Sequence, residues 1–145
     1  MPNWCENVIL LDGSKKEINM FNEEIERLQR KSSESNVFVG LFSSFASIED
    51  EKGDYSSNLA YDLWGPDDDV EVCEFELFTE NGTSIFHIDT RWDPPIPFVY
   101  HLSNFYPEII FNLKSYEPGR NILLDMSFQK GKLVEQMAYE ELDFD

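Results

Sequence analysis

Residues 70–92 read VEVCEFELFTENGTSIFHIDTRW, and this stretch decides the fold. Apolar and polar side chains alternate on both sides of Asn81 and Gly82, and an Asn-Gly pair between two alternating runs is the strongest short-range signal for a β-hairpin. Because successive side chains of a strand point to opposite faces, the pattern predicts one buried and one exposed face. The residues expected on the buried face are Cys73, Phe75, Leu77, Phe86, Ile88 and Trp92, and those on the exposed face are Glu74, Glu76, His87, Asp89 and Arg91.

The sequence before the hairpin predicts a strand and an amphipathic helix. Residues 7–13, NVILLDG, are a short apolar run ended by a glycine, as in a buried strand. Ser14 and Glu17 match a capping box, in which two side chains satisfy the free backbone N–H groups at a helix start. A helix over 15–31 follows from the helical spacing of Ile18, Phe21, Ile25 and Leu28.

The sequence after the hairpin predicts one helix and three strands. The prolines of residues 93–97, DPPIP, break the second strand and suit the first turn of a helix, which we place at 96–105. Three apolar runs follow at 109–119, 121–128 and 132–139, and each predicts a strand.

Together these elements predict a single α+β domain over residues 1–145. Their order is that of a ferredoxin-like fold, in which two helices cover one face of an antiparallel sheet. We expect two additions to it, an irregular acidic insertion at 43–69 after the first helix and an extra C-terminal hairpin. Residues 140–145 are expected to form an acidic tail.

The chain is strongly and unevenly acidic. Its 145 residues include 29 Asp and Glu against 11 Lys and Arg, which gives a net charge of −18. Residues 32–90 hold 14 of the acidic residues and one cation, Lys52, and so account for −13 of that charge. Such a charge repels phosphate backbones and anionic lipids, so we expect no direct binding to nucleic acid or membrane. A basic partner protein would instead be steered toward it.

The cysteines and the N-terminus favour a cytoplasmic protein without a cofactor. Cys5 and Cys73 are too few for a disulfide scaffold and belong to no metal-binding pair, so we expect both to be buried small hydrophobic residues. The first residues lack the basic and apolar segments of a signal peptide. No stretch approaches the ~20 apolar residues of a membrane span.

Three stretches of the chain carry a family resemblance. They are MPNWCEN at residues 1–7, Leu63-Trp64-Gly65, and TRWDPPIPFVYHLSNFYPEIIFNLKSYEPG at 90–119 with its Trp-x-Pro-Pro and Tyr-Pro sequences. With these stretches the chain resembles the YubB-type ferredoxin-like family, small accessory proteins of plasmids, phages and other mobile elements. The resemblance implies a ferredoxin-like fold and a mobile-element setting in a host cell, and it implies no catalytic residues. The chain departs from the family after Gly65, where it has Pro66 and three aspartates.

Asp67, Asp68 and Asp69 are the first candidate site. Consecutive aspartates do not supply the alternating ligands and the central glycine of an EF-hand calcium loop. A magnesium site needs fewer protein carboxylates and stays an alternative. An acidic run is more often a solvated loop, which is the interpretation we favour.

His87 and Asp89 are the second candidate site, on the exposed face of the predicted hairpin with Glu74 and Glu76 opposite. A histidine near carboxylates can act as a general base. Cross-strand pairs of opposite charge also simply stabilise a sheet, and this second interpretation is the simpler one.

The leading hypothesis is a non-catalytic protein of a phage or mobile element that inhibits a basic host protein, such as a nucleic-acid-binding defence protein. Its carboxylates would stand where phosphates bind, and association would slow as salt rises. The alternatives are a metal-dependent or acid/base enzyme on the His87 face and a homo-oligomerising module. The three tryptophans are core residues or, where exposed, interface anchors. The expected partner-binding residues are Glu49, Asp50, Glu51, Asp54, Tyr61, Asp62, Trp64, Asp67, Asp68, Asp69, Glu71, Glu74 and Glu76.

Overall fold

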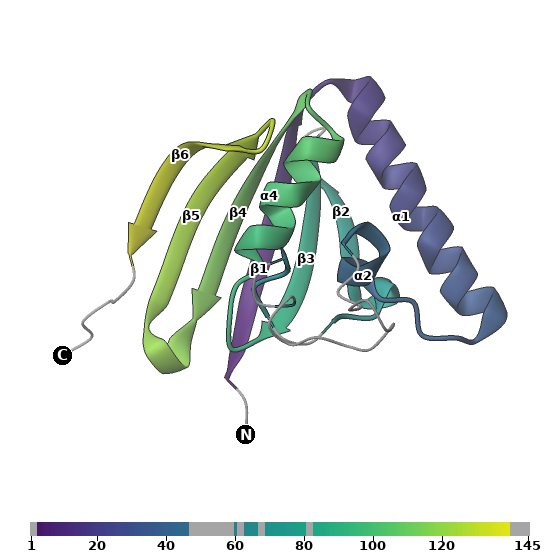
Figure 1. Ribbon diagram of the computed structural model, residues 1–145, viewed down its shortest axis with the longest axis horizontal. Helices are drawn as coiled ribbons and strands as arrows, with labels where there is room; N and C mark the ends of the chain where they lie inside the picture. Colours follow the sequence, from purple (N-terminus) through teal and green to yellow (C-terminus); the bar gives the residue numbers. More distant parts are fainter. Residues whose placement is uncertain (1–2, 47–59, 61–62, 67–68, 81–82, 140–145) are drawn as a thin grey trace.

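The computed structural model describes residues 3–46, 60, 63–66, 69–80 and 83–139 of the chain (Figure 1). The described elements, in chain order, are β1 (Trp4–Gly13), α1 (Lys15–Ser35), α2 (Leu41–Phe45), the 3₁₀ helix η1 (Val72–Glu74), β2 (Glu76–Glu80), β3 (Thr83–Arg91), α4 (Ile96–Phe105), β4 (Ile109–Glu117), the 3₁₀ helix η2 (Pro118–Arg120), β5 (Ile122–Gln129) and β6 (Lys132–Tyr139).

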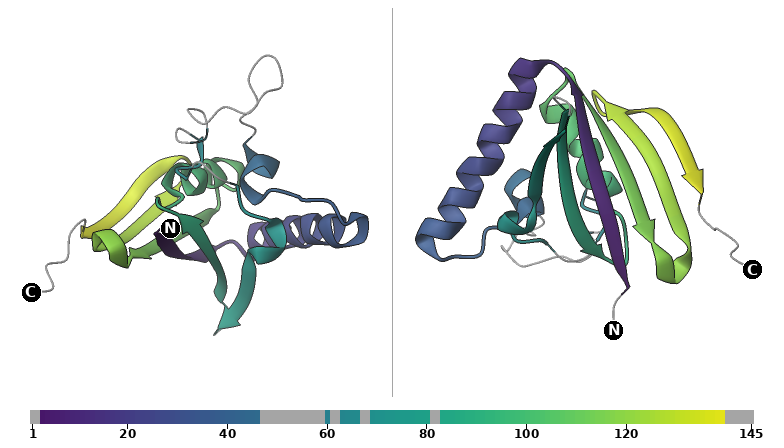
Figure 2. Two further views of the ribbon diagram at one scale, coloured as in Figure 1. Left: turned by 90° about the horizontal axis from the view of Figure 1, so that it is seen from below. Right: turned by 180° about the vertical axis from the view of Figure 1, so that it is seen from behind.

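One antiparallel sheet organises the structure. Its six strands lie in the order β2-β3-β1-β4-β5-β6, so β2 and β6 form its edges. In Figure 1, α4 lies in front of the sheet, and the right-hand view of Figure 2 shows the sheet from the other side, with the strands in front of α4. The fold is α+β, with an open six-stranded antiparallel sheet and three α-helices in the described part of the chain.

The hydrophobic core lies between the helices and the sheet. Phe21 of α1 is at its centre, with edge-on ring contacts to Phe86 of β3 at 5.2 Å and to Phe111 of β4 at 5.8 Å. Phe98 of α4 packs against Phe42 of α2 with ring centroids 4.7 Å apart. All five rings are at most 1% exposed. Burying a side chain of this size contributes roughly 1.5–3 kcal/mol, so this aromatic cluster holds α1, α2 and α4 to the sheet.

Helix α1 confirms the predicted helix and is longer than predicted. The Ser14 hydroxyl accepts the N–H of Glu17 at 3.4 Å, as an N-cap does. The Glu17 carboxylate does not complete the capping box, because it accepts the backbone N–H of Glu108 at 2.6 Å and ties the helix start to the chain before β4. The helix ends at Ser35 because Asn36, a residue that tolerates the left-handed conformation, adopts a φ of 53° there.

The first strand of the predicted hairpin begins later than the alternation suggests. Residues 72–74 form the 3₁₀ helix η1, and Gln29 of α1 fixes it by donating its side-chain amide to the carbonyls of Val72 at 3.2 Å and Phe75 at 3.0 Å. The 3₁₀ turn buries residues three apart, so Val72 and Phe75 enter the core and Cys73 is exposed. The prediction of a buried Cys73 is therefore wrong, and Leu77 on the edge strand is 39% exposed.

The second strand confirms Phe86 and Ile88 as core residues and contradicts Trp92. β3 ends at Arg91, and Trp92 has a φ of 66° with the N–H of Asp93 donating to the Arg91 carbonyl at 2.7 Å. This tight turn takes the indole out of the alternation, so Trp92 is 40% exposed.

The rest of the chain follows the prediction with one addition. Helix α4 occupies the predicted residues 96–105, and β4, β5 and β6 fall on the three predicted apolar runs. The expected irregular insertion at 43–69 overlaps α2, a short helix that starts before it. Its residues 47–59, 61–62 and 67–68 lie outside the described part of the chain, as does the predicted tail at 140–145.

Candidate functional site

Most of the predicted partner-binding residues of the insertion lie outside the described residues. They are Glu49, Asp50, Glu51, Asp54, Tyr61, Asp62, Asp67 and Asp68. The structure therefore places five of the predicted set: Trp64, Asp69, Glu71, Glu74 and Glu76.

Trp64 is a core residue. Its side chain is 2% exposed, its ring packs against Phe42 at 5.7 Å, and its indole N–H donates to the carbonyl of Ala46 at 2.8 Å. A buried indole with a satisfied N–H cannot serve as an interface anchor, so the structure decides the open question about this tryptophan in favour of the core.

Asp69 caps a helix. Its carboxylate accepts the backbone N–H of Phe42 at 2.7 Å and of Ser43 at 3.1 Å, at the start of α2. A Cβ at Gly40 would overlap the Asp69 carboxylate, so a larger residue there would require this side chain to shift. Asp69 thus has a local structural role.

Glu71 joins three segments. Its carboxylate accepts the hydroxyl of Ser32 at 2.5 Å, the N–H of Val39 at 3.0 Å and the N–H of Cys73 at 3.4 Å. Burial raises the pKa of Glu71, but these hydrogen bonds outweigh burial, and its pKa lies below the ordinary value. Glu71 is therefore ionised, and its hydrogen bonds link α1, the chain before α2 and η1.

Glu74 and Glu76 lie on the wall of a hollow at the open face of the sheet. The hollow has a volume of about 580 Å³ and is also lined by Trp4, Cys73, His87 and Asp89. The strand register explains the gathering, because Trp4 of β1 pairs with Arg91 of β3, and Glu76 of β2 pairs with His87. The structure thus brings together the His87 face that the sequence predicts.

A second hollow shares part of its lining with the first. It has a volume of about 270 Å³ and has Trp4, Glu74 and Asp89 in common with the first hollow. Its other lining residues are Phe38, Asp69, Val70, Glu71 and Arg91. Because the two hollows share Trp4, Glu74 and Asp89, we treat them as one groove. We call it the Trp4 groove and define it by Trp4, Phe38, Glu74, Glu76, His87 and Asp89.

The Trp4 groove combines carboxylates with exposed aromatic rings. Trp4 is 53% and Phe38 is 63% exposed, although both are large apolar side chains. The His87 Nε2 lies 3.6 Å from the Asp89 carboxylate, which is a loose ion-pair distance. No group of three metal-binding side chains occurs among the described residues. The groove is suited to holding a cation through carboxylates and an aromatic face.

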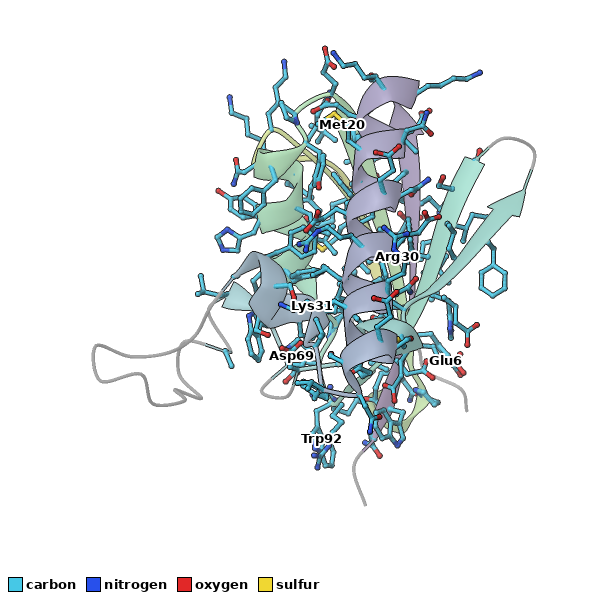
Figure 3. All side chains as sticks on the ribbon, turned by 90° about the vertical axis from the view of Figure 1, so that its right-hand side faces the viewer. Glu6, Met20, Arg30, Lys31, Asp69 and Trp92 are labelled. Carbon is cyan, nitrogen blue, oxygen red and sulfur yellow. The ribbon has the colours of Figure 1, made fainter. Side chains whose placement is uncertain are left out.

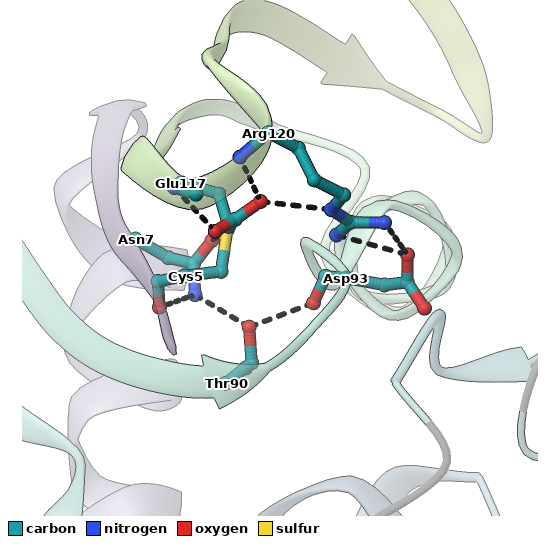
Figure 4. A network of polar contacts seen from close by, with 7 residues as sticks. Cys5, Asn7, Thr90, Asp93, Glu117 and Arg120 are labelled. Carbon is teal, nitrogen blue, oxygen red and sulfur yellow. Dashed lines mark hydrogen bonds and ion pairs between the residues drawn. The ribbon is translucent and has the colours of Figure 1, made fainter. Parts of the chain in front are cut away.

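A polar network in the core, where β1, β3 and β4 meet, is the other notable cluster (Figure 4). The fully buried Asn7 donates its amide to Thr90 Oγ1 at 2.9 Å and to the Ile88 carbonyl at 3.1 Å, and it accepts the Ser115 hydroxyl at 2.6 Å. The Thr90 hydroxyl in turn donates to the Asp93 carbonyl at 2.7 Å.

Glu117 and Arg120 complete this network at the end of β4. The Glu117 carboxylate accepts the N–H of Gly119 at 2.9 Å, the N–H of Arg120 at 3.0 Å and the Arg120 Nε at 2.8 Å. Arg120 also reaches the Asp93 carboxylate at 3.5 Å. Every buried polar side-chain atom of this network has a hydrogen-bond partner. The network therefore stabilises the fold and is not an open site.

Sequence reasoning missed Phe38, and it left Trp4 undecided. Trp4 precedes the buried Cys5 on β1, so its side chain lies on the opposite, exposed face of the strand. The sequence shows this only if the strand is known to begin at Trp4, and the predicted strand begins at residue 7. Phe38 lies between α1 and α2 and has no periodic pattern to mark it.

Fold and site define a small α+β protein with an acidic groove on the open face of its sheet. Among solved structures, the chain is similar to protein api92 from Yersinia pseudotuberculosis, which is assigned to the family DUF1281. The similarity covers 99% of this chain and 100% of that chain, with a TM-score of 0.62 and 10% sequence identity. At this identity the similarity shows a common fold alone. No family model and no curated protein matches the chain.

None of the helices in the described part of the chain combines the length and apolar character needed to cross a bilayer.

Proposed function

We propose that this chain is a non-catalytic acidic binding protein that occupies a basic surface of another protein. The observation that carries the proposal is the Trp4 groove, where Glu74, Glu76 and Asp89 line the same hollow as an exposed tryptophan. A net charge of −18 steers a basic partner to the surface, and the aromatic ring supplies the contact area that charge alone lacks.

The proposed fold type is ferredoxin-like with a C-terminal hairpin added. Support comes from the strand order, in which β1 lies between β3 and β4 while β2 is at the edge, as a split βαβ arrangement requires. The hairpin of β5 and β6 then extends the sheet beyond β4.

The proposed setting is a phage or other mobile element acting in the cytoplasm of a host cell. The resemblance of MPNWCEN and of residues 90–119 to the YubB-type family supports it. The proposed target is a nucleic-acid-binding defence protein, since its basic groove matches the charge of this chain and carboxylates can compete there with phosphates.

The test is a capture experiment with the tagged chain and host lysate at low and at physiological salt. Two charge variants are compared with the wild type: Asp67 and Asp68 both changed to Asn, and Glu74→Gln with Glu76→Gln and Asp89→Asn. The proposal would be supported if the wild type retains one basic nucleic-acid-binding protein, if purified DNA displaces that protein, and if either variant fails to retain it. Retention of no basic protein at either salt concentration would overturn it.

A second candidate function is an enzyme on the same face. The observation that favours it is the approach of His87 to Asp89 at 3.6 Å, with Glu76 paired to His87 across the strands. A histidine between carboxylates is suited to acid/base or metal chemistry. The two candidates differ in their expected response to divalent metal ions.

A further inference from the structure

We propose that the Trp4 groove, together with Trp92 beside it, receives an arginine-bearing extended segment of the basic partner. This inference rests on the proposed function and makes it specific. It moves the contact from the acidic insertion to the open face of the sheet, and it names the partner side chain.

The first step is the backbone of Trp92. A φ of 66° is rare for a bulky residue, and the other described non-glycine residues with positive φ are Asn36, Asn121 and Lys130. Strained residues of this kind persist only where neighbours hold them, and they concentrate at binding and catalytic sites. Here the N–H of Trp92 donates to the Asn3 carbonyl at 2.8 Å.

The strain has a visible consequence, since it presents an indole that the core does not use. Trp92 is 40% exposed although the alternation of β3 would have buried its side chain. A glycine would adopt the same turn without strain, so local structure alone does not explain a tryptophan here.

The second step is that the two exposed tryptophans lie at one end of the sheet. Trp4 pairs with Arg91, the residue before Trp92, and the Trp92 N–H bonds the residue before Trp4. Figure 3 shows Trp92 at the same end of the molecule as Glu6 and Asp69, away from Met20. The backbones of the two residues are therefore neighbours, and exposed tryptophans are enriched among interface hot spots.

The third step is charge. Glu6 and Asp89 pair across β1 and β3, and Glu74 and Glu76 lie on the wall of the groove, whereas Arg91 is a cationic side chain that lines the second hollow. This excess of carboxylates repels a second copy of the chain and any nucleic acid, so the occupant is a basic protein segment. Aromatic rings and carboxylates together favour arginine over lysine, because the planar guanidinium stacks on an indole while it bonds carboxylates at its edge.

The test uses two blocked peptides, one of alternating arginine and serine and one with lysine in place of arginine. Binding is followed by tryptophan fluorescence, to which the exposed Trp4 and Trp92 respond. We expect the wild type to bind the arginine peptide about tenfold more tightly than the lysine peptide. Equal affinities, or no binding of the arginine peptide at low salt, would overturn the inference.

Matched variants locate the site, with binding then followed by calorimetry. Two variants are each expected to weaken arginine-peptide binding about tenfold. They are the single variant Trp4→Thr and the double variant Glu74→Gln with Asp89→Asn. The controls are Phe78→Thr, an exposed ring on the same face outside both hollows, and Glu23→Gln with Glu26→Gln, which removes the same charge from α1. Equal weakening by the two charge variants would show that net charge alone attracts the peptide. This result would overturn the inference that the Trp4 groove is the binding site, and it would leave the proposed function standing.

Trp92→Gly separates a binding role from a structural one. If the indole is kept for the partner, this variant keeps a melting temperature close to that of the wild type, because relief of the backbone strain offsets the loss of the partly buried indole, and it binds the arginine peptide less tightly. A lower melting temperature with unchanged peptide binding would show that Trp92 serves folding, and it would remove Trp92 from the proposed surface.

Discussion

The fully buried carboxylate of Glu117 accepts a hydrogen bond from the Nε of Arg120 at 2.8 Å, and Arg120 in turn reaches the Asp93 carboxylate at 3.5 Å. This contact joins the end of β4 to the turn that follows β3. In the sequence, the ends of β3 and β4 look like two unrelated strand endings. In the structure, the ion pair between Arg120 and Asp93 joins them. Asp93 is also part of the turn that presents Trp92, because its N–H donates to the Arg91 carbonyl at 2.7 Å.

Glu117→Ala is expected to lower the free energy of unfolding by about 2–4 kcal/mol, because it leaves two backbone N–H groups and a guanidinium without their acceptor. For a chain of this size the melting temperature should fall by roughly 5–12 °C. Thermal unfolding followed by circular dichroism measures it. Glu117→Gln should cost less because it keeps an acceptor oxygen, and exposed Glu23→Ala on α1 is the control. A melting temperature equal to that of the wild type would contradict the role of Glu117.

The two cysteines should differ sharply in reactivity. Burial raises the pKa of the Cys5 thiol to about 12, whereas Cys73 is exposed at the surface of η1. Since the thiolate is the reactive form, a thiol reagent at about pH 8 should modify Cys73 at once and Cys5 only on unfolding. Counting thiols with and without denaturant checks this, and Cys73→Ser should abolish the fast reaction. Two fast thiols in the folded protein would show that Cys5 is not sealed in the core.

The stability of the protein should depend on acid through Glu71. Its pKa in the folded protein lies below the ordinary value of 4.5, because hydrogen bonds from Ser32, Val39 and Cys73 stabilise the carboxylate. The stability from these bonds is complete above about pH 4.5, the pKa expected in the unfolded chain, and is lost as the pH falls through the lower folded pKa. Glu71→Gln should cost on the order of 1 kcal/mol at neutral pH and flatten the acid limb of the stability curve. Urea unfolding across this pH range measures both, and an unchanged acid limb in Glu71→Gln, with exposed Glu34→Gln as the control, would refute the assignment.

Divalent metal ions distinguish the binding protein from the enzyme. If the Trp4 groove binds a partner and no metal, Mg²⁺, Mn²⁺ or Zn²⁺ should leave the melting temperature of the wild type and of His87→Ala unchanged. A site that binds metal would raise the melting temperature, because a ligand that binds only the folded state stabilises it by an amount that grows with the logarithm of the ligand concentration divided by Kd. Stabilisation of the wild type that His87→Ala removes would favour the enzyme.

The chain should remain a monomer of 17.0 kDa over a wide range of concentration. A net charge of −18 makes copies repel one another, and the register shift of β5 and β6 at Ser127 and Phe128 makes the β6 edge irregular, which discourages pairing between edges. Light scattering at low and high salt measures the mass. A mass that rises with concentration would support the oligomerising module that the sequence left as an alternative.

The acidic insertion marks the limit of the site prediction. Sequence composition places the strongest charge there, and the expected contacts at 49–62 and 67–68 stay a prediction because they lie outside the described residues. Of the residues that are described, Asp69 and Glu71 accept hydrogen bonds from backbone N–H groups, and Trp64 is buried. Composition counts carboxylates, and it does not show which of them are already bound within the fold.

The sequence by itself determined the local elements. Helix α1, helix α4 and the strands β4 to β6 were predictable because a capping serine, a proline and a periodic pattern act within a few residues of each other. The tertiary structure alone decided the exposure of Cys73 and Trp92 and the existence of the Trp4 groove. Gln29 of α1 fixes the 3₁₀ turn that exposes Cys73, and the pairing of β1 with β3 brings Trp4 beside Asp89 from the far end of the chain. Such contacts join residues that are remote in sequence, so their physical cause is the packing of whole elements, which no local pattern contains.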